Sequence, residues 1–232
     1  MGEDADRARE AAARAALERI EDGMTIGLGS GRAVWRVIAL LADRADGRPA
    51  VRAAFASGRT AELGRDVGIE PVELDGDTRL DLAIDGADEV GPDLALIKGG
   101  GAALLREKLV VSAAERFVVV AESSKRVDRL GTGFALPVEV VRFAWRDTRR
   151  RLLDLLPTAE GRTDETGDPV VTDEGHYLLD CGLPAEGDLA ALGDAIKATV
   201  GVVEHGLFIG LADEALLGRD DGGVDVVGRD PG

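Results

Sequence analysis

Apolar positions follow two kinds of spacing along the first half of the chain, and the two kinds alternate. Three- and four-residue spacing, typical of amphipathic helices, predicts helices at 4–21, 32–43, 60–67 and 102–112. Short apolar runs, typical of buried strands, lie between them at 24–28, 51–56, 80–85 and 117–122. This strand–helix alternation predicts an α/β fold with a parallel sheet and helices on both of its faces.

The pattern changes after Gly131-Thr132-Gly133. The later segments predict a strand at 137–143, a helix at 145–156, a hairpin of 170–172 with 177–181, and a helix at 189–199. We expect these elements to form a small α+β domain at 131–205, inserted in a larger domain made of 1–130 plus 206–232. Glycine-punctuated strand character returns at 202–211, and the Asp- and Gly-rich stretch 219–232 is expected to end in a frayed tail.

Composition narrows the class of protein. The 232 residues include 45% hydrophobic residues, enough to bury a core, and a net charge of −16. Such an acidic chain is a poor partner for nucleic acid or an anionic membrane, and its apolar runs are too short to span a bilayer. The single cysteine, Cys181, excludes a disulfide framework. With an acidic N-terminus unlike a signal peptide, a soluble cytoplasmic protein is expected.

Basic residues are strongly biased toward arginine. Of 28 basic residues only Lys98, Lys108, Lys125 and Lys197 are lysines, which leaves 28 − 4 = 24 arginines. Many acids together with arginine in place of lysine favour a salt-loving source such as a halophilic archaeon, and a GC-rich genome gives the same bias. We therefore expect the protein to lose structure as salt is removed.

The first candidate site is the run Gly27-Leu28-Gly29-Ser30-Gly31 between a predicted strand and a helix. Backbone amides in such a turn, with the helix dipole, favour an anion. Because Arg32 and Ala33 follow, neither the dinucleotide nor the Walker pattern is met, so a small phosphate or carboxylate is the preferred ligand. The alternative is a tight turn that binds nothing.

An acidic cluster, Asp81 to Glu89, follows the strand at 80–85. Asp85 is expected at the carboxyl end of the strand, where open α/β sheets bind ligands, and Gly86 lets the chain turn so that Asp88 approaches Asp85. Two close carboxylates suit acid–base chemistry. A surface turn without a ligand and a magnesium site are the alternatives.

The most informative stretch is Lys98-Gly99-Gly100-Gly101 followed by a helix that carries Glu107. Three glycines before a helix predict an oxyanion or phosphate nest. Apolar residues flank Glu107 one turn away on both sides, so desolvation would raise its pKa and make it a general base. Alternatively, Glu107 pairs with Arg106, Lys108 or an arginine of another domain. Lys125, after a buried strand, is placed to reach an anion or is an ordinary loop lysine.

These motifs occur in an order that resembles the type A ribose-5-phosphate isomerases. The resemblance rests on Gly27–Gly31, Ser57 with Thr60, Asp85-Gly86-Ala87-Asp88-Glu89, Lys98–Gly101 through Arg106-Glu107-Lys108, Ser123-Ser124-Lys125, Leu136–Val140 and Val202–Phe208. It implies interconversion of ribose 5-phosphate and ribulose 5-phosphate through an enediolate in the non-oxidative pentose phosphate pathway, with no cofactor and no metal. It also implies a Rossmann-like domain with an inserted domain, in a homodimer or homotetramer.

The resemblance implies a role for each motif residue. Glu107 would be the base, and Lys98 with the Gly99–Gly101 amides would stabilise the oxyanion. Asp85 and Asp88 would hold sugar hydroxyls and assist ring opening, whereas Ser30 with its turn and Lys125 would hold the phosphate. The expected substrate-binding residues are Ser30, Gly31, Arg32, Ala33, Asp85, Gly86, Ala87, Asp88, Lys98, Gly99, Gly100, Gly101 and Lys125.

The chain departs from the family pattern at the phosphate turn, where Gly31-Arg32-Ala33 replaces the usual Gly-Ser-Thr. Backbone amides and the Arg32 guanidinium are expected to replace the missing hydroxyls. Arg9 also stands where the family often has lysine.

Three other functions remain open from the sequence. An amino-sugar-phosphate deaminase would release ammonia, and a sugar-phosphate sensor of a transcription regulator would need a DNA-binding module. A CoA-transferase-like relative would bind CoA. The sequence has no Gly-x-Ser-x-Gly elbow for a serine hydrolase, and His176 and His205 are too far apart to suggest a metal pair.

Overall fold

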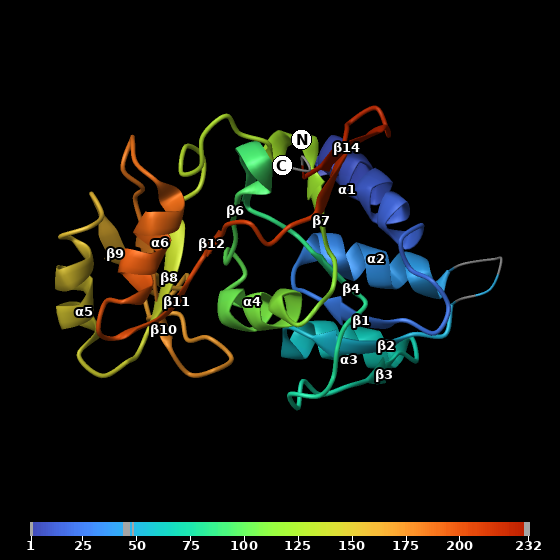
Figure 1. Cartoon of the computed structure of the whole chain (residues 1–232), viewed down its shortest axis with the longest axis horizontal. Coiled ribbons are helices and arrows are strands. Elements are labelled where there is room, and N and C mark those ends of the chain that lie inside the picture. Colours follow the sequence, from blue (N-terminus) through green and yellow to red (C-terminus); the bar gives the residue numbers. More distant parts are fainter. Residues whose placement is uncertain (1, 44–46, 48, 230–232) are drawn as a thin grey trace.

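A seven-stranded sheet forms the centre of the computed structural model, which describes residues 2–43, 47 and 49–229 (Figure 1). The strand order is β14-β13-β7-β4-β1-β2-β3. The strands are β1 (Thr25–Leu28), β2 (Arg52–Phe55), β3 (Glu70–Pro71), β4 (Leu82–Asp85), β7 (Phe117–Glu122), β13 (Glu214–Gly218) and β14 (Val224–Gly228). All neighbours pair in parallel except β13 and β14. The predicted α/β fold with a parallel sheet is confirmed.

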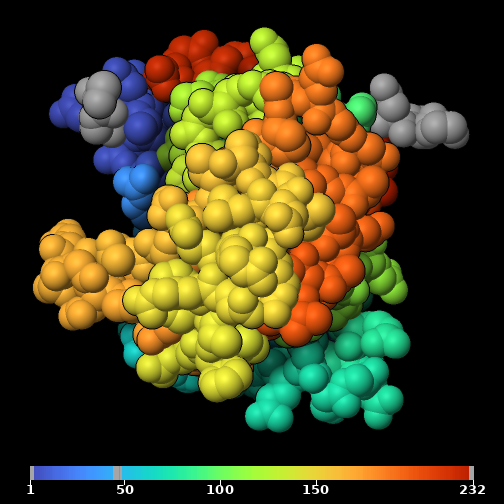
Figure 2. Space-filling model, turned by 90° about the vertical axis from the view of Figure 1, so that its left-hand side faces the viewer, coloured from blue at the N-terminus to red at the C-terminus, as the bar shows by residue number. Residues whose placement is uncertain are grey.

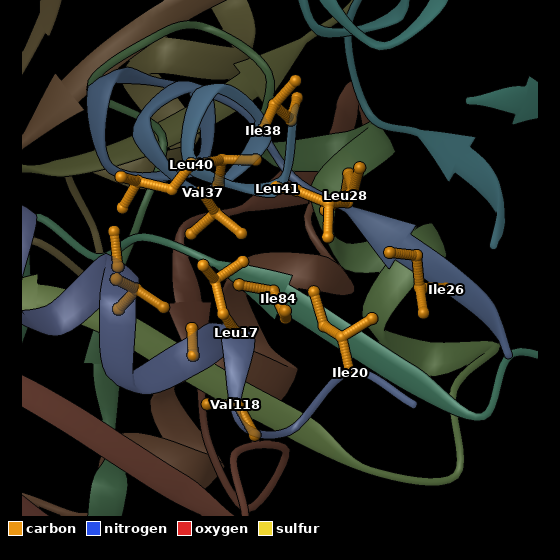
Figure 3. Packing of buried hydrophobic residues seen from close by; sticks show 14 of the residues in the cluster. Leu17, Ile20, Ile26, Leu28, Val37, Ile38, Leu40, Leu41, Ile84 and Val118 are labelled. Atoms are coloured by element: carbon orange, nitrogen blue, oxygen red, sulfur yellow. The ribbon is translucent and has the colours of Figure 1, made fainter. Parts of the chain in front are cut away.

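Helices pack on both faces of this sheet, as predicted. Helices α1 (Gly2–Leu17), α2 (Arg32–Ala42) and α3 (Gly58–Asp66) contribute to one apolar cluster, and α4 (Leu104–Ser112) packs on the opposite face. Because strand side chains alternate, Ile84 and Val118 join the α1–α2 cluster (Figure 3). Ala83 and Val119 lie on the other face and pack with Val111 of α4.

Two smaller sheets extend from this core. The three-stranded sheet has the order β12-β6-β5, with β5 (Glu89–Val90), η1 (Pro92–Leu94), β6 (Leu96–Ile97) and β12 (Leu207–Phe208). The antiparallel four-stranded sheet has the order β11-β8-β10-β9. It consists of β8 (Leu136–Val140), β9 (Ala159–Gly161), β10 (Tyr177–Cys181) and β11 (Val202–His205), next to α5 (Trp145–Leu152) and α6 (Leu189–Lys197).

We call the four-stranded sheet with α5 and α6 the small unit. Figure 2 views the molecule from this side, with the small unit in yellow and orange in front. All its strands lie between Leu136 and His205, and the next strand, β12, pairs with β6 outside it. The division into domains at 131 and 205 remains a prediction.

Several predicted elements differ from the structure. The first helix ends at Leu17 rather than Glu21, and the arm at 170–172 forms only an isolated bridge from Val171 to Tyr177. Most of the stretch expected to end in a frayed tail is ordered, because β13 and β14 form a hairpin over residues 214–228, and residues 230–232 lie outside the described residues. Arg219 stabilises the turn of this hairpin by pairing with Asp221 and Asp225, so the acids and glycines that suggested disorder are turn residues. In the described part of the chain, no helix has both the length and the hydrophobicity needed to cross a membrane.

Candidate active site

The first two motifs meet at the carboxyl ends of β1 and β4, which are parallel neighbours. Oδ1 of Asp85 accepts hydrogen bonds from the amides of Ser30 at 3.2 Å and Gly86 at 2.7 Å. A Cβ atom on Gly29 would lie 1.9 Å from Cγ of Asp85. Glycine is therefore required at position 29 so that the turn can approach the carboxylate.

Lys98, just after β6, lies at the centre of the polar groups. Its Nζ is 2.9 Å from Oδ2 of Asp85 and 3.1 Å from Oε2 of Glu107, and it donates a hydrogen bond to the Gly86 carbonyl at 2.7 Å. The Lys98 side chain is only 3% exposed. One buried cation therefore faces two buried carboxylates, so one negative charge has no counterion when both carboxylates are ionised.

Glu107 lies in the first turn of α4 and is buried, as predicted. Its sequence neighbours point elsewhere, because Arg106 pairs with Asp173 and Glu174, and Lys108 pairs with Glu204. Pairing of Glu107 with either neighbour is thus excluded, and its partner is Lys98. Within the described residues, Oε2 of Glu107 and Oδ2 of Asp85 lie close to Lys98 but have no well-directed hydrogen bond.

Burial is the main cause of the unusual titration of this cluster. The pKa of Glu107 is raised to about 8, mainly by desolvation and also by the charge of Asp85, while Lys98 opposes the rise. Burial also raises the pKa of Asp85. Burial alone would lower the Lys98 pKa, but Asp85 and Glu107 together raise it, so Lys98 stays protonated. Glu107 can therefore gain and lose a proton near neutral pH.

The other acids of the cluster have separate uses. Asp88 is half-buried, and its Oδ2 accepts the Gly100 amide at 2.7 Å, which ties the acidic turn to the glycine loop. Glu89 instead accepts the amides of Gly131 and Phe134 near the start of the small unit. Asp81 accepts the Thr25 amide. Of these acids, Asp85 and Asp88 therefore belong to the site, whereas Asp81 and Glu89 are structural.

A cavity of about 350 Å³ opens above these groups. The predicted residues that line it are Ser30, Gly31, Arg32, Ala33, Gly86, Ala87, Asp88, Lys98, Gly99, Gly100, Gly101, Glu107 and Lys125. Asp85 is not among them: it is fully buried and contacts Lys98 from behind the cavity wall. Burial of this kind depends on how the strands and helices pack, which the spacing of the acids does not reveal.

Four residues of the cavity wall were not predicted, namely Arg9, Trp35, Val120 and Glu122. Arg9 is buried on α1 and pairs with Asp6 and Glu122 at 2.5 Å each. The sequence drew attention to Arg9 only where the family often has lysine, and its place between buried alanines of a helix is a second signal for it. Trp35 and Val120 offered no such signal, because apolar residues in a helix and a strand are ordinary core residues.

The start of α2 also lines the cavity. Gly31 precedes the helix and has no side chain to cap it, so within the described residues the first amides of α2 have no capping side chain. The Ser30 amide is not available, because Asp85 accepts it. The side chains of Arg32 and Lys125 have no ion pair or hydrogen bond with any residue in the described ranges. The cavity wall therefore offers the amides at the start of α2 and the cations of Arg32 and Lys125 to an anion.

No group of three or more metal-ligating side chains occurs within residues 2–43, 47 and 49–229. His176 contacts the buried Glu139 in the small unit, and Nδ1 of His205 accepts the Leu207 amide. The two histidines thus have separate structural contacts.

Known proteins can now be set beside this geometry. Residues 53–222 match the family model of ribose 5-phosphate isomerase A (phosphoriboisomerase A), which is well over half of the chain. The chain belongs to the ribose 5-phosphate isomerase A family.

Similar members of this family match almost from end to end. Ribose-5-phosphate isomerase A of Synechococcus sp. (strain JA-3-3Ab) is 47% identical over 94% of this chain and 96% of its own length. The protein of that name from Caulobacter vibrioides (strain NA1000 / CB15N) is 49% identical, with 95% and 97% covered.

Solved structures of the family agree in fold. A D-ribose-5-phosphate isomerase in complex with phospho-erythronic acid has a TM-score of 0.92 at 34% identity, covering 97% of this chain and 99% of that one. Ribose 5-phosphate isomerase A from Methanocaldococcus jannaschii has a TM-score of 0.89 at 35% identity, with 96% and 99% covered.

Proposed function

We propose that the protein interconverts D-ribose 5-phosphate and D-ribulose 5-phosphate through an enediolate, without a cofactor, as a step of the non-oxidative pentose phosphate pathway. The observation that carries this proposal is the buried Glu107 carboxylate next to Lys98 at the wall of a cavity of about 350 Å³. The family membership supports the same reaction.

Glu107 is the base in this proposal. Its carboxylate takes the proton from C2 of the open-chain aldose, the C2–H electron pair forms the C1–C2 double bond, and O1 becomes an oxyanion. Glu107 then returns the proton to C1 while a proton moves from O2 to O1, which gives the ketose. A base with a pKa of about 8 holds the transferred proton and releases it again at neutral pH.

Lys98 and the glycine loop face the developing negative charge. The Lys98 ammonium is buried at the cavity wall, where a positive charge stabilises an oxyanion more strongly than in water. The glycine loop adds the Gly101 amide, whereas the Gly100 amide is already accepted by Asp88. Asp85, placed behind Lys98, fixes that ammonium through a 2.9 Å contact, so we assign Asp85 a positioning role and Asp88 the sugar hydroxyls.

The phosphate is assigned to the start of α2. The uncapped amides there, the Lys125 ammonium and the Arg32 guanidinium provide the donors that a phosphate dianion needs. Ser30 contributes its hydroxyl, which lies 3.2 Å from the Ser57 hydroxyl. Arg9 is already paired with two acids, so we expect a smaller contribution from it.

The test compares wild type with Glu107→Gln in an assay of ribulose 5-phosphate formation from ribose 5-phosphate, in molar KCl with a chelator. Loss of the base should reduce kcat by about a thousandfold. The matched control is Glu174→Gln, which removes a surface carboxylate that pairs with Arg106 and should keep full activity. An inactive, folded wild type would overturn the proposal, and ammonia release from glucosamine 6-phosphate would then be tested.

We also infer that the protein acts in the cytoplasm as a homodimer or homotetramer, with residues 131–205 as a separate inserted domain. The resemblance of the whole chain to the family supports this. Light scattering in molar KCl measures the oligomer, and a monomer at working concentration would contradict it.

A further inference from the structure

An arginine of the small unit reaches into the glycine loop of the candidate site. Arg162 directly follows β9, and its Nη1 donates hydrogen bonds to the carbonyls of Gly99 at 2.8 Å and Gly100 at 3.2 Å. The side chain is only 14% exposed. Arg162 lies outside the motifs that define the site, and it does not line the cavity.

Asp180 holds the guanidinium of Arg162, and neighbouring segments of the chain hold its backbone. Its Nε donates to Oδ2 of Asp180 at 3.0 Å and its Nη2 donates to Oδ1, which is a bidentate pair. Its backbone amide donates to Leu178, and its carbonyl accepts the amide of Val170 at 3.0 Å. The position of Nη1 is therefore fixed by the sheet of the small unit.

Anchored carbonyls determine where the amides of the loop point. In a planar trans peptide the C=O and N–H groups point in opposite directions. With the Gly99 and Gly100 carbonyls directed at Arg162, the amides of Gly100 and Gly101 must point away from it. The Gly100 amide does so and donates to Asp88 at 2.7 Å. The Gly101 amide has no partner among the described residues, and Gly101 lines the cavity.

The loop depends on such an anchor because glycine imposes little conformation of its own. Gly99 has φ +108°, and a Cβ on Gly100 would lie 2.6 Å from Asp88, so neither position accepts a stiffer residue without strain. The loop therefore keeps its glycines. The Ala102 amide, at 3.1 Å from the Gly99 carbonyl, closes its turn, and Arg162 and Asp88 set its orientation from outside.

We propose that Arg162 is a positioning residue for the isomerisation: by holding the Gly99 and Gly100 carbonyls, it aims the Gly101 amide at the oxyanion of the enediolate and keeps the Gly100 amide on Asp88. This inference rests on the proposed function. Arg162 touches no substrate, and its charge also polarises the two peptide groups, which makes their N–H groups better donors.

The experiment compares Arg162→Met and Arg162→Lys with wild type in steady-state kinetics and in inhibition by two probes. Phospho-erythronic acid carries a carboxylate where the oxyanion forms, and erythritol 4-phosphate lacks it. Arg162→Met should reduce kcat by about 10- to 100-fold with little change in KM, because a transition-state donor is misdirected. It should raise the inhibition constant of phospho-erythronic acid by a similar factor. The inhibition constant of erythritol 4-phosphate should stay within about twofold of the wild-type value. The kcat of Arg162→Lys should lie between those of wild type and Arg162→Met, because one ammonium cannot bind both Asp180 and the two loop carbonyls.

Arg149→Met is the matched control. Arg149 also belongs to the small unit, donates to a backbone carbonyl and pairs with Glu160, but has no contact with the glycine loop. It should keep wild-type kinetics. If Arg162→Met does not fold, Asp180→Asn removes the charged anchor while keeping the arginine, and it should lower kcat in the same selective way.

Equal weakening of both probes, or an unchanged kcat in folded Arg162→Met, would overturn the positioning role. Different results contradict the two proposals. If the folded wild type has no isomerase activity, the proposed function is wrong. If wild type is active, Glu107→Gln is inactive and Arg162→Met is fully active, only the role of Arg162 is wrong.

Discussion

At the scale of single residues, the chemistry of Glu107 comes from its surroundings in space. Burial and the neighbouring Asp85 raise its pKa to about 8, and Lys98 limits the rise. Only the carboxylate form can accept the C2 proton. We expect kcat/KM to rise about tenfold per pH unit below pH 8 and to level off above it, which a pH–rate profile measures.

Lys98→Met tests the cause of this profile. Removing the only cation within ion-pair distance of Glu107 in the described structure should move the rising limb to higher pH and lower its plateau. Lys197→Met, which removes a half-exposed lysine that pairs with Glu204, should leave the limb in place. An unchanged limb in folded Lys98→Met would show that Glu107 does not control the rate.

Gly29 gives a second prediction at this scale. In Gly29→Ala the new Cβ would lie 1.9 Å from Asp85, so the buried carboxylate would be pushed from Lys98. Overpacking of this kind costs about 1–3 kcal/mol, and activity should fall with it. Gly58→Ala is the control, because a Cβ there meets nothing within 4 Å and φ is not positive. Urea unfolding of both variants measures the difference, and equal stability of the two would contradict the proposed close approach.

At the scale of elements, the connection from β11 to β12 joins the small unit to α4. Nζ of Lys108 on α4 donates to Glu204 at 2.8 Å and to the carbonyls of His205 and Leu207. Lys197 of α6 holds the other oxygen of Glu204. These contacts fix α4, the helix that carries Glu107, relative to the four-stranded sheet of β11 and the three-stranded sheet of β12.

His205 makes this connection sensitive to acid. Burial and the charge of Lys108 lower its pKa from 6.5 to about 4, and its Nδ1 must be unprotonated to accept the Leu207 amide. Below pH 6.5 His205 binds a proton in the unfolded chain, whereas in the folded protein it stays unprotonated down to about pH 4. Stability should therefore fall by about 3 kcal/mol as pH drops through this window.

Urea unfolding between pH 7 and 4 measures this loss. His205→Asn can still accept the Leu207 amide but does not titrate, so it should have a flatter profile. Gly58→Ala is the control, since it changes no titratable group and its new Cβ meets nothing within 4 Å, and it should keep the wild-type slope. An identical slope in His205→Asn would assign the acid sensitivity to other groups.

Elements were predictable from sequence where their own pattern determines them. The predicted strand at 117–122 and the predicted helix start at Arg32 match the structure. A continuous apolar run indicates a buried strand, and amphipathic spacing indicates a helix with one buried face. Short strands such as β5 and β6 are only two residues long and have no period to detect. The C-terminal hairpin was missed since its turn residues resemble a disordered tail.

The residues of the candidate site also divide into those that local sequence pattern predicts and those that it does not. Glu107 was predictable because its apolar neighbours lie on its own helix. The contact of Asp85 with the Ser30 amide and the anchoring of the glycine loop by Arg162 join residues 55 or more positions apart. Such contacts depend on how sheets and units pack, which one sequence without its fold does not specify.

At the scale of the whole molecule, charge is the dominant feature, with a net charge of −16 on 232 residues. Arginines form many of the ion pairs, as in Arg106 with Asp173 and Glu174, but exposed pairs of this kind contribute at most about 1 kcal/mol each. The unpaired excess of acids repels itself over the whole surface. This repulsion destabilises the compact state when little salt is present.

Salt should therefore stabilise the protein, and mostly at low concentration. The screening length falls from about 30 Å at 0.01 M to about 10 Å at 0.1 M and about 3 Å at 1 M. Repulsion between distant acids is removed first, whereas ion pairs near 3 Å, such as Arg106 with Asp173, are screened last. We expect the urea midpoint at pH 7 to rise steeply between 0.01 and 0.1 M KCl and more slowly up to 1 M. Sucrose at equal osmolality, which does not screen charge, is the control. A midpoint that is constant or falls with KCl would mean that the local ion pairs outweigh the net charge, and the predicted need for salt would then be wrong.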